Sequence, residues 1–204
     1  HENGVLHGDV KLLNAVRVGT RLRLIDLDAS ATMGRKSYAG AKFSSGMLPP
    51  EMIAELTFDE NDKYMAYFET NVNAAIPEKI KPKGVEGSNT IFAVKTFLVK
   101  QEETEVFKDD ELVLIRNQVP HKSEELPYDM VEATAAIDIW SFGTILDQLH
   151  THTGEALFQV DRDDNLTDTA SMKELHEWNY TTKETKLEKV LGSAASKSLL
   201  KKVL

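Results

Sequence analysis

The chain has 204 residues, of which 41% are hydrophobic and 28% are charged, and its formal net charge is −9. These values are typical of a folded globular domain and exclude wholesale disorder, while the negative charge argues against broad binding to nucleic acid or to an anionic membrane. The absence of cysteine excludes disulfides, thiolate zinc sites and a cysteine nucleophile, and no apolar run reaches the roughly 18 residues of a membrane span.

The N-terminal part of the chain predicts a short hairpin followed by a long loop. Residues 16–18 and 21–27 have the alternating character of strands, and Gly19-Thr20 between them suits a tight turn. Residues 29–48 are small, polar and interrupted by glycine, which predicts a loop. Loops of this length inside compact domains are usually functional or disordered.

The middle of the chain has weaker signals. Residues 51–70 have mixed helical character, and residues 76–89 contain two prolines, two glycines and three lysines. This composition predicts a flexible connection with solvated lysines. Residues 90–100 and 111–119 are rich in β-forming residues and are separated by a charged stretch, which predicts a hairpin.

The clearest helix spans about residues 134–149. Its apolar residues recur at helical spacing, with two more that widen the same face, so we expect it to be deeply buried. The recurring residues are Ile139, Phe142, Leu146 and Leu149, and the two flanking ones are Trp140 and Ile145. Further helices are expected near residues 170–178 and 194–204.

The first motif that carries chemistry is the stretch from His7 to Asn14, HGDVKLLN. Transfer of a γ-phosphoryl group needs a base for the attacking hydroxyl, a cation near the phosphate and ligands for a metal ion. Asp9, Lys11 and Asn14 supply these three kinds of group. A polar loop that caps the next strand is the alternative interpretation of this octapeptide.

Three further motifs follow in the chain. Asp26 ends a predicted strand in the sequence LIDLDA, where its carboxylate suits magnesium, although acidic residues close strands in many folds. Pro49-Pro50-Glu51 closes the long loop. The sequence DIWSFG, from Asp138 to Gly143, opens the long helix; a core helix with an acidic N-terminus is the alternative interpretation here.

The order H-x-D-x-K-x-x-N, L-I-D, P-P-E and D-x-W-S-x-G resembles the C-terminal lobe of eukaryotic-type protein kinases, over residues 1–52 and 126–204. The resemblance implies a mainly α, α+β lobe: a helical bundle around a buried central helix, with small hairpins at the catalytic loop and in an insertion at about residues 55–125. It also implies a missing N-lobe upstream of residue 1, ATP and Mg²⁺ as cofactors, and a protein substrate modified on serine or threonine. We expect a cytoplasmic protein or the intracellular domain of a membrane protein.

The resemblance assigns a role to each matching residue. Asp9 matches the catalytic base, Lys11 the lysine that contacts the γ-phosphate, and Ser44 the residue that links the substrate loop to the catalytic aspartate. Asn14 and Asp26 match the magnesium ligands.

The remaining assignments concern the adenine site and the scaffold. Val16 falls where the family places an apolar side chain beneath the adenine. Asp138 matches the helix residue that holds the backbone of the catalytic loop, and Glu51 matches the partner of a family arginine that would follow Leu204. The matching positions expected to support the site are His7, Glu51, Asp138 and Trp140.

The sequence also departs from the family pattern. Gly8 replaces an arginine that receives an activating phosphate, so we predict that loop phosphorylation is not the switch. Asp28 replaces the glycine of D-F-G. Two alternatives therefore stay open. One is a non-catalytic scaffold lobe. The other is a small-molecule phosphotransferase of the aminoglycoside or choline kinase type, whose motif has glycine at the position of Gly8.

Overall fold

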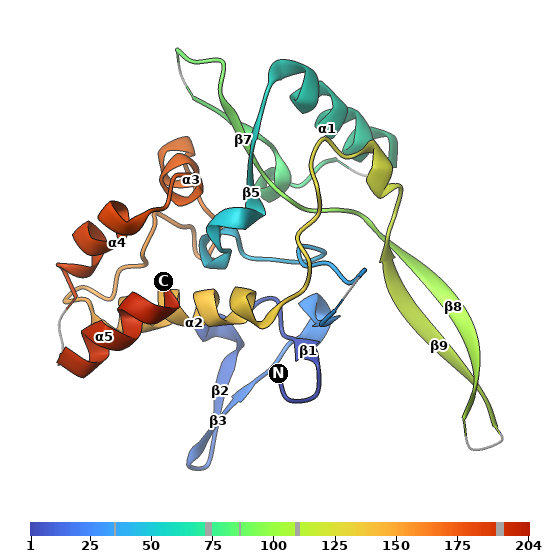
Figure 1. Cartoon of the computed structure of the whole chain (residues 1–204), viewed down its shortest axis with the longest axis horizontal. Helices are drawn as coiled ribbons and strands as arrows, with labels where there is room; N and C mark the ends of the chain where they lie inside the picture. The colour runs from blue at the N-terminus through green and yellow to red at the C-terminus, as the bar shows by residue number, and fades with distance from the viewer. Residues whose placement is uncertain (35, 72–74, 86, 109–110, 191–193) are drawn as a thin grey trace.

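The computed structural model describes residues 1–34, 36–71, 75–85, 87–108, 111–190 and 194–204, and within residues 101–118 it describes the backbone alone. The architecture is α+β, with five α-helices and small antiparallel sheets in the described part of the chain (Figure 1). The helices are α1 (Phe58–Asn71), α2 (Ala135–His150), α3 (Thr169–His176), α4 (Tyr180–Leu187) and α5 (Ala194–Val203).

The strands form four small sheets in the described residues. Three are two-stranded: β1 (Val5–Leu6) with β4 (Ala31–Thr32), β2 (Ala15–Val18) with β3 (Arg21–Leu24), and β8 (Val99–Lys108) with β9 (Glu111–Pro120). The fourth has the order β5 (Ile53–Leu56), β7 (Ile91–Val94) and β6 (Lys83–Gly84).

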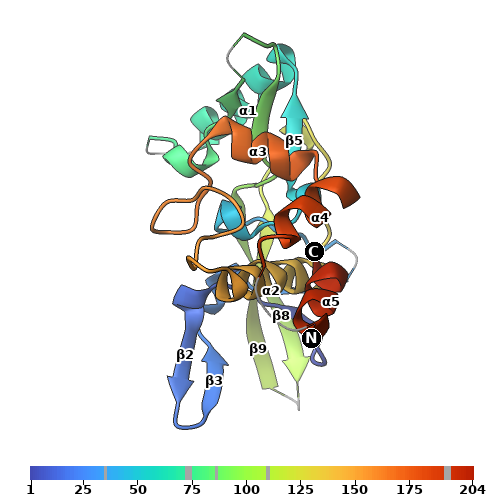
Figure 2. The same ribbon diagram turned by 90° about the vertical axis from the view of Figure 1, so that its left-hand side faces the viewer.

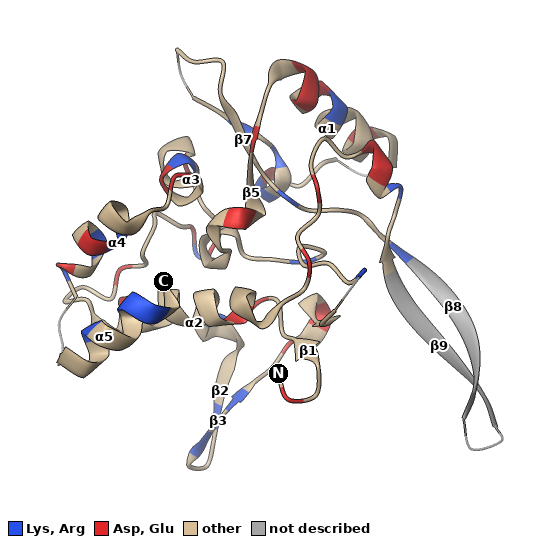
Figure 3. Ribbon diagram, in the orientation of Figure 1, with Lys and Arg blue, Asp and Glu red and all other residues tan. Residues whose placement is uncertain are grey.

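The predicted N-terminal hairpin is confirmed. Val18 pairs with Arg21 across the Gly19-Thr20 turn, and Gly19 has a positive φ of 61° that suits glycine. The second strand ends at Leu24, earlier than expected, because Asp26 adopts the left-handed conformation with φ 63°. The hairpin has basic side chains and no acidic ones (Figure 3).

The main hydrophobic core lies between the sheet of β5 and β7, helices α1 and α3, and the first turns of α2 (Figures 1 and 2). Its most buried large side chains include Tyr64, Tyr67 and Phe68 of α1 and Phe92 of β7. These residues fall in the segment at about residues 55–125 that was expected to be an insertion. The segment is therefore not a pure surface excursion, since α1, β5 and β7 supply much of the core, whereas the β8–β9 hairpin extends away from it (Figure 1).

Two expectations for the middle of the chain also need correction. The predicted hairpin exists, but its first strand is β8 (Val99–Lys108), which shares only residues 99–100 with the predicted strand 90–100; residues 91–94 form β7 and join β5 and β6 instead. Residues 76–85 are not merely a flexible connection. They contain a 3₁₀ turn, Glu78–Ile80, with a buried Ile80, and the strand β6.

The predicted helices α2, α3 and α5 are present, and Trp140 and Ile145 of α2 are buried as expected, but three of the four recurring apolar residues of α2 are not. Ile139, Phe142 and Leu149 are 44%, 46% and 62% exposed. The buried face instead alternates apolar with polar residues, because loop carbonyls supply acceptors: Ser141 Oγ donates to Met47 O (2.8 Å). Hydrophobic spacing alone could not identify such a face, since its polar members are satisfied only by distant loops.

Candidate functional site

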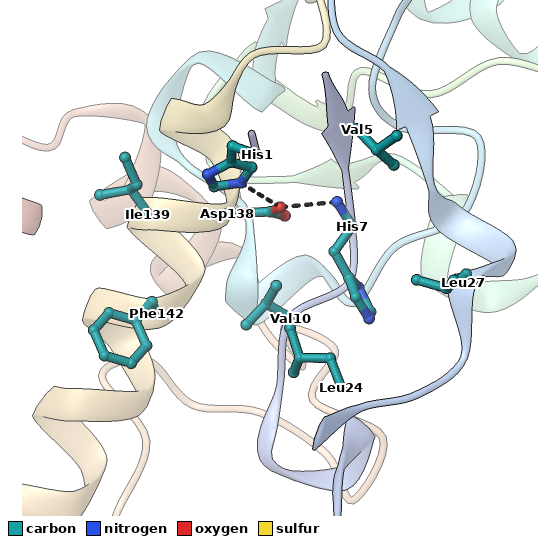
Figure 4. A pocket seen from close by; sticks show the side chains of 9 residues that line it. All are labelled: His1, Val5, His7, Val10, Leu24, Leu27, Asp138, Ile139 and Phe142. Atoms are coloured by element: carbon teal, nitrogen blue, oxygen red, sulfur yellow. Dashed lines mark hydrogen bonds and ion pairs between the residues drawn. The ribbon is translucent and has the colours of Figure 1, made fainter. Parts of the chain in front are cut away.

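The loop at residues 7–9 is held by the N-terminal turn of α2. The buried Asp138 carboxylate accepts hydrogen bonds from the backbone N–H groups of His7 (2.8 Å) and Gly8 (2.9 Å), and it contacts His1 Nε2 at 2.9 Å (Figure 4). The buried His7 ring donates from Nε2 to the carbonyl oxygen of Ile25 (3.1 Å). These contacts join the loop to both α2 and the end of the β3 strand.

Gly8 is required by the geometry of this loop. Its φ is +82°, and a Cβ atom at this position would lie 2.3 Å from the backbone oxygen of Ala29. A side chain would therefore meet both a strained backbone conformation and a steric clash. This explains why glycine, and no arginine, stands between His7 and Asp9.

Asp9 has one oriented and one free carboxylate oxygen. The residue is 4% exposed, and its Oδ2 lies 3.3 Å from Lys11 Nζ and accepts a hydrogen bond from Asn14 Nδ2 (3.2 Å). Asn14 Nδ2 also donates to the Asp9 backbone oxygen (2.9 Å). Among the described residues, nothing donates to Asp9 Oδ1. Asp9 is therefore a buried carboxylate that is hydrogen-bonded at one oxygen and both enclosed and unpartnered at the other.

Lys11 links Asp9 to the loop that ends at the two prolines. Its ammonium donates to the hydroxyl of the buried Ser44 at 2.7 Å. The turn after Asp9 is a 3₁₀ helix, Leu12–Asn14, which brings Asn14 back onto Asp9. The structure thus brings together four of the predicted residues: Asp9, Lys11, Asn14 and Ser44.

Asp26 lies beside this group and is paired with a lysine that sequence reasoning missed. Lys42 Nζ is 3.1 Å from Asp26 Oδ2 and 3.2 Å from Asp28 Oδ2. The hydrogen bond from Lys42 lowers the pKa of Asp26, to which Lys11 adds a smaller electrostatic effect. Lys42 lies within the glycine-interrupted loop, and the sequence has no signal that would have assigned it to these carboxylates.

The side chains of Asn14 and Asp26 suit a magnesium ion that is bound together with the phosphates of a ligand. No cluster of three histidine or acidic side chains suited to a metal occurs in the described residues. Mg²⁺, however, is commonly bound by one or two carboxylates together with substrate phosphates and water. The Asp26 carboxylate would provide one such ligand if the metal displaced Lys42, whose ammonium donates to both of its oxygens. The amide oxygen of Asn14 provides another, and no described side chain donates to it.

The other predicted positions have more varied surroundings. Val16 is half-buried on β2, and Glu51 is exposed, with no ion pair in the described part of the chain. Trp140 is buried, and its ring packs edge-on against Trp178 with 5.4 Å between the ring centroids. Trp140 therefore belongs to the core that supports α2.

Lys79 is exposed, as expected for a linker lysine, but its ammonium also makes contacts that the sequence did not predict. Its ammonium donates to the backbone oxygen of Phe43 (3.2 Å) and lies 4.9 Å from the centroid of the Phe43 ring. The contact joins residues far apart in the chain, next to Ser44. Local composition could not reveal it, because it depends on how the 3₁₀ turn at Glu78–Ile80 packs.

A hollow of about 430 Å³ lies on the other side of the His7 loop, between α2 and the β2–β3 hairpin (Figure 4). Its lining is mostly apolar: Val5, Val10, Leu24, Leu27, Ile139 and Phe142, with His1, His7 and Asp138. The polar groups here already bond to one another or to the backbone. The chemistry therefore belongs to the Asp9 group and the hollow contributes apolar surface.

Comparison with protein-family models, with curated proteins and with solved structures finds no match to this chain. No helix in the described residues combines the length and the apolar character needed to cross a membrane. The assignment of a function therefore depends on the motifs and on the geometry of the site.

Proposed function

We propose that this chain is the C-terminal lobe of a protein kinase that transfers phosphate from ATP to serine or threonine residues of a protein. The observation that carries the proposal is the arrangement at Asp9. Its buried carboxylate is oriented by Lys11 and Asn14, it has one unpartnered oxygen, and Lys11 ties it to Ser44. Four residues that the motif order assigns to one reaction lie together, although Ser44 is distant in sequence.

In this proposal each residue has one physical task. The Asp9 carboxylate accepts the proton of the substrate hydroxyl, while Asn14 and Lys11 orient it through their contacts with Oδ2. The Lys11 ammonium neutralises negative charge on the transferred phosphate. Asn14 and Asp26 would hold Mg²⁺, which supplies further neutralisation of the phosphate oxygens when it is bound.

The test is Asp9→Asn in the protein that contains this chain. Phosphotransfer from ATP should fall at least about a hundredfold, since general base catalysis contributes roughly 10² to 10⁴ in rate. Asp59→Asn, at an exposed position of α1, is the matched control and should keep full activity. Unchanged turnover in the Asp9 variant would contradict the proposal.

The same assay separates proteins from small molecules as substrates. A basic protein and a panel of small alcohols are offered in parallel to the unaltered chain. Phosphate on protein serine or threonine supports the kinase proposal, and transfer to the alcohols alone supports the small-molecule phosphotransferase.

The second candidate is a scaffold lobe without catalysis, and one observation favours it. Lys42 engages the carboxylates of both Asp26 and Asp28, so an internal cation already occupies the acidic group beside the site. Binding of ATP that depends on magnesium, without any transfer of phosphate, would support this candidate against the first.

A further inference from the structure

Asp147 is a buried carboxylate of α2 that the proposed chemistry at Asp9 does not use. It is 3% exposed, and it forms neither a hydrogen bond nor an ion pair with any described residue. Burial raises its pKa to about 6, and the electrostatic effects of Lys186 and His150 oppose this shift without a direct contact. At neutral pH the carboxylate is therefore mostly ionised and lacks a partner for its charge.

This carboxylate lies in the wall of a second hollow, which has a volume of about 530 Å³. We call it the α2–α4 hollow, because residues of α2, α3 and α4 line it together with the loop at residues 155–160. Leu157 and Phe158 of this loop are 6% and 4% exposed, and Ala156 and Val160 extend the same apolar wall. Such a wall suits the alkyl chain of a ligand.

Two hydroxyl groups of the same lining can only accept hydrogen bonds from a ligand. Thr151 Oγ1 donates to the carbonyl oxygen of Gln148 (3.0 Å), and Ser171 Oγ donates to Asp168 Oδ2 (3.0 Å). Each hydroxyl thus uses its single hydrogen within the protein and keeps its acceptor capacity. Together with the Asp147 carboxylate, these groups favour a ligand that donates hydrogen bonds.

The two lysines of the lining do not supply the missing partner of Asp147. Lys186 Nζ donates to the carbonyl oxygen of Leu157 (2.9 Å), pairs with Glu174 at 2.8 Å and lies 5.2 Å from the centroid of the Phe158 ring. Lys189 is exposed at the edge of the hollow. The contacts of Lys186 show that this apolar wall accommodates an alkylammonium group.

We propose that the α2–α4 hollow binds a primary alkylammonium group, whose nitrogen lies at Asp147 and whose alkyl chain packs on Leu157 and Phe158. Small amines and the lysine side chain of a partner protein share this chemistry. Asp147 Oδ1 is enclosed, so the carboxylate offers a ligand one oxygen, which suits a compact ammonium better than a two-pronged guanidinium. The lining also has more carboxylates than lysines, because Glu155 and Glu174 belong to it.

The hollow shares no lining residue with the Asp9 group, so the test needs no phosphate transfer. The isotopically labelled chain is titrated at pH 7.5 with n-butylammonium and, separately, with n-butanol, and the shifts of its backbone amide signals in NMR spectra give both affinities. Butylammonium should bind at least about tenfold more tightly than butanol, since a hydrogen bond to a charged partner is worth that much. The amides of Leu157 and Ser171 should be among those that shift.

Asp147→Asn should abolish the preference for butylammonium, and it should fold, because it removes a buried charge without a partner. Asp59→Asn, the same change at an exposed position of α1, is the matched control and should keep the preference. The inference is overturned if the two ligands bind equally well, if Asp147→Asn keeps the preference, or if the shifted amides lie outside the hollow.

A further titration distinguishes the two sources of the ammonium group. It uses a short peptide with one lysine between alanines and the same peptide with norleucine, which has the alkyl chain without the charge. Tighter binding of the lysine peptide that depends on Asp147 identifies a lysine of a partner protein as a ligand that fits. Binding of butylammonium without binding of the lysine peptide restricts the hollow to small amines, and either result upholds the inference.

Discussion

Asp138→Asn should destabilise the protein strongly, because the carboxylate of Asp138 is the acceptor for two backbone N–H groups. His7 N and Gly8 N donate to it at 2.8 and 2.9 Å, and the side chain is buried. An asparagine of nearly the same shape offers a single oxygen. Its NH₂ group would face one of the two N–H donors, which would be left without an acceptor.

The magnitude follows from these contacts. A buried donor without a partner costs about 1–3 kcal/mol, and the remaining bond loses the extra strength that a charged acceptor provides, about 1 kcal/mol. Loss of the negative charge in the first turn of α2 adds about 0.3–1 kcal/mol. We expect the free energy of unfolding to fall by about 2–5 kcal/mol, a large part of the roughly 5–15 kcal/mol that holds a domain folded.

Urea unfolding followed by tryptophan fluorescence measures this change directly. The chain has two tryptophans, and the rings of Trp140 and Trp178 pack against each other beside the core, so their emission reports the loss of tertiary structure. The unfolding midpoint should shift to lower urea with an unchanged slope. A loss below about 0.5 kcal/mol would refute the reasoning, since that is the range of surface substitutions far from such contacts.

Two further predictions concern stability. Burial raises the pKa of Asp147 from 3.8 to about 6, and its Oδ1 has no partner among the described residues. Between about pH 4 and 6 the folded state therefore binds more protons than the unfolded state. Stability falls as pH rises through that window. Asp147→Asn should therefore raise the free energy of unfolding by about 1–2 kcal/mol at pH 7.5 and change it little at pH 4.5, which urea unfolding at both pH values checks; equal effects at the two values would contradict it. Gly8→Ala should cost at least about 2 kcal/mol, because the new Cβ meets Ala29 O and φ is +82°. Gly4 has a φ of +66° and open space around it, so Gly4→Ala should lose only the backbone contribution of about 1 kcal/mol. Thermal unfolding of the two variants measures both losses. Equal losses for Gly4→Ala and Gly8→Ala would contradict the steric argument.

The local features of the fold could be predicted from the sequence. The β2–β3 hairpin follows from alternating side chains around Gly19-Thr20, and α3 and α5 lie where helical spacing placed them. The motif of Asp9, Lys11 and Asn14 could be predicted for the same reason, since its members lie within six consecutive residues. Such signals depend on neighbours a few residues apart, which a single sequence displays.

The tertiary structure alone decided which distant parts meet. It turned the Ile139 and Phe142 face of α2 outward, because Ser141 and Asp138 on the other face find their hydrogen-bond partners in remote loops. It likewise brought Lys42 to Asp26 and Lys79 to Phe43. A polar residue becomes a buried or functional residue only when a partner reaches it, and that partner is fixed by packing across the whole chain, which local periodicity does not encode.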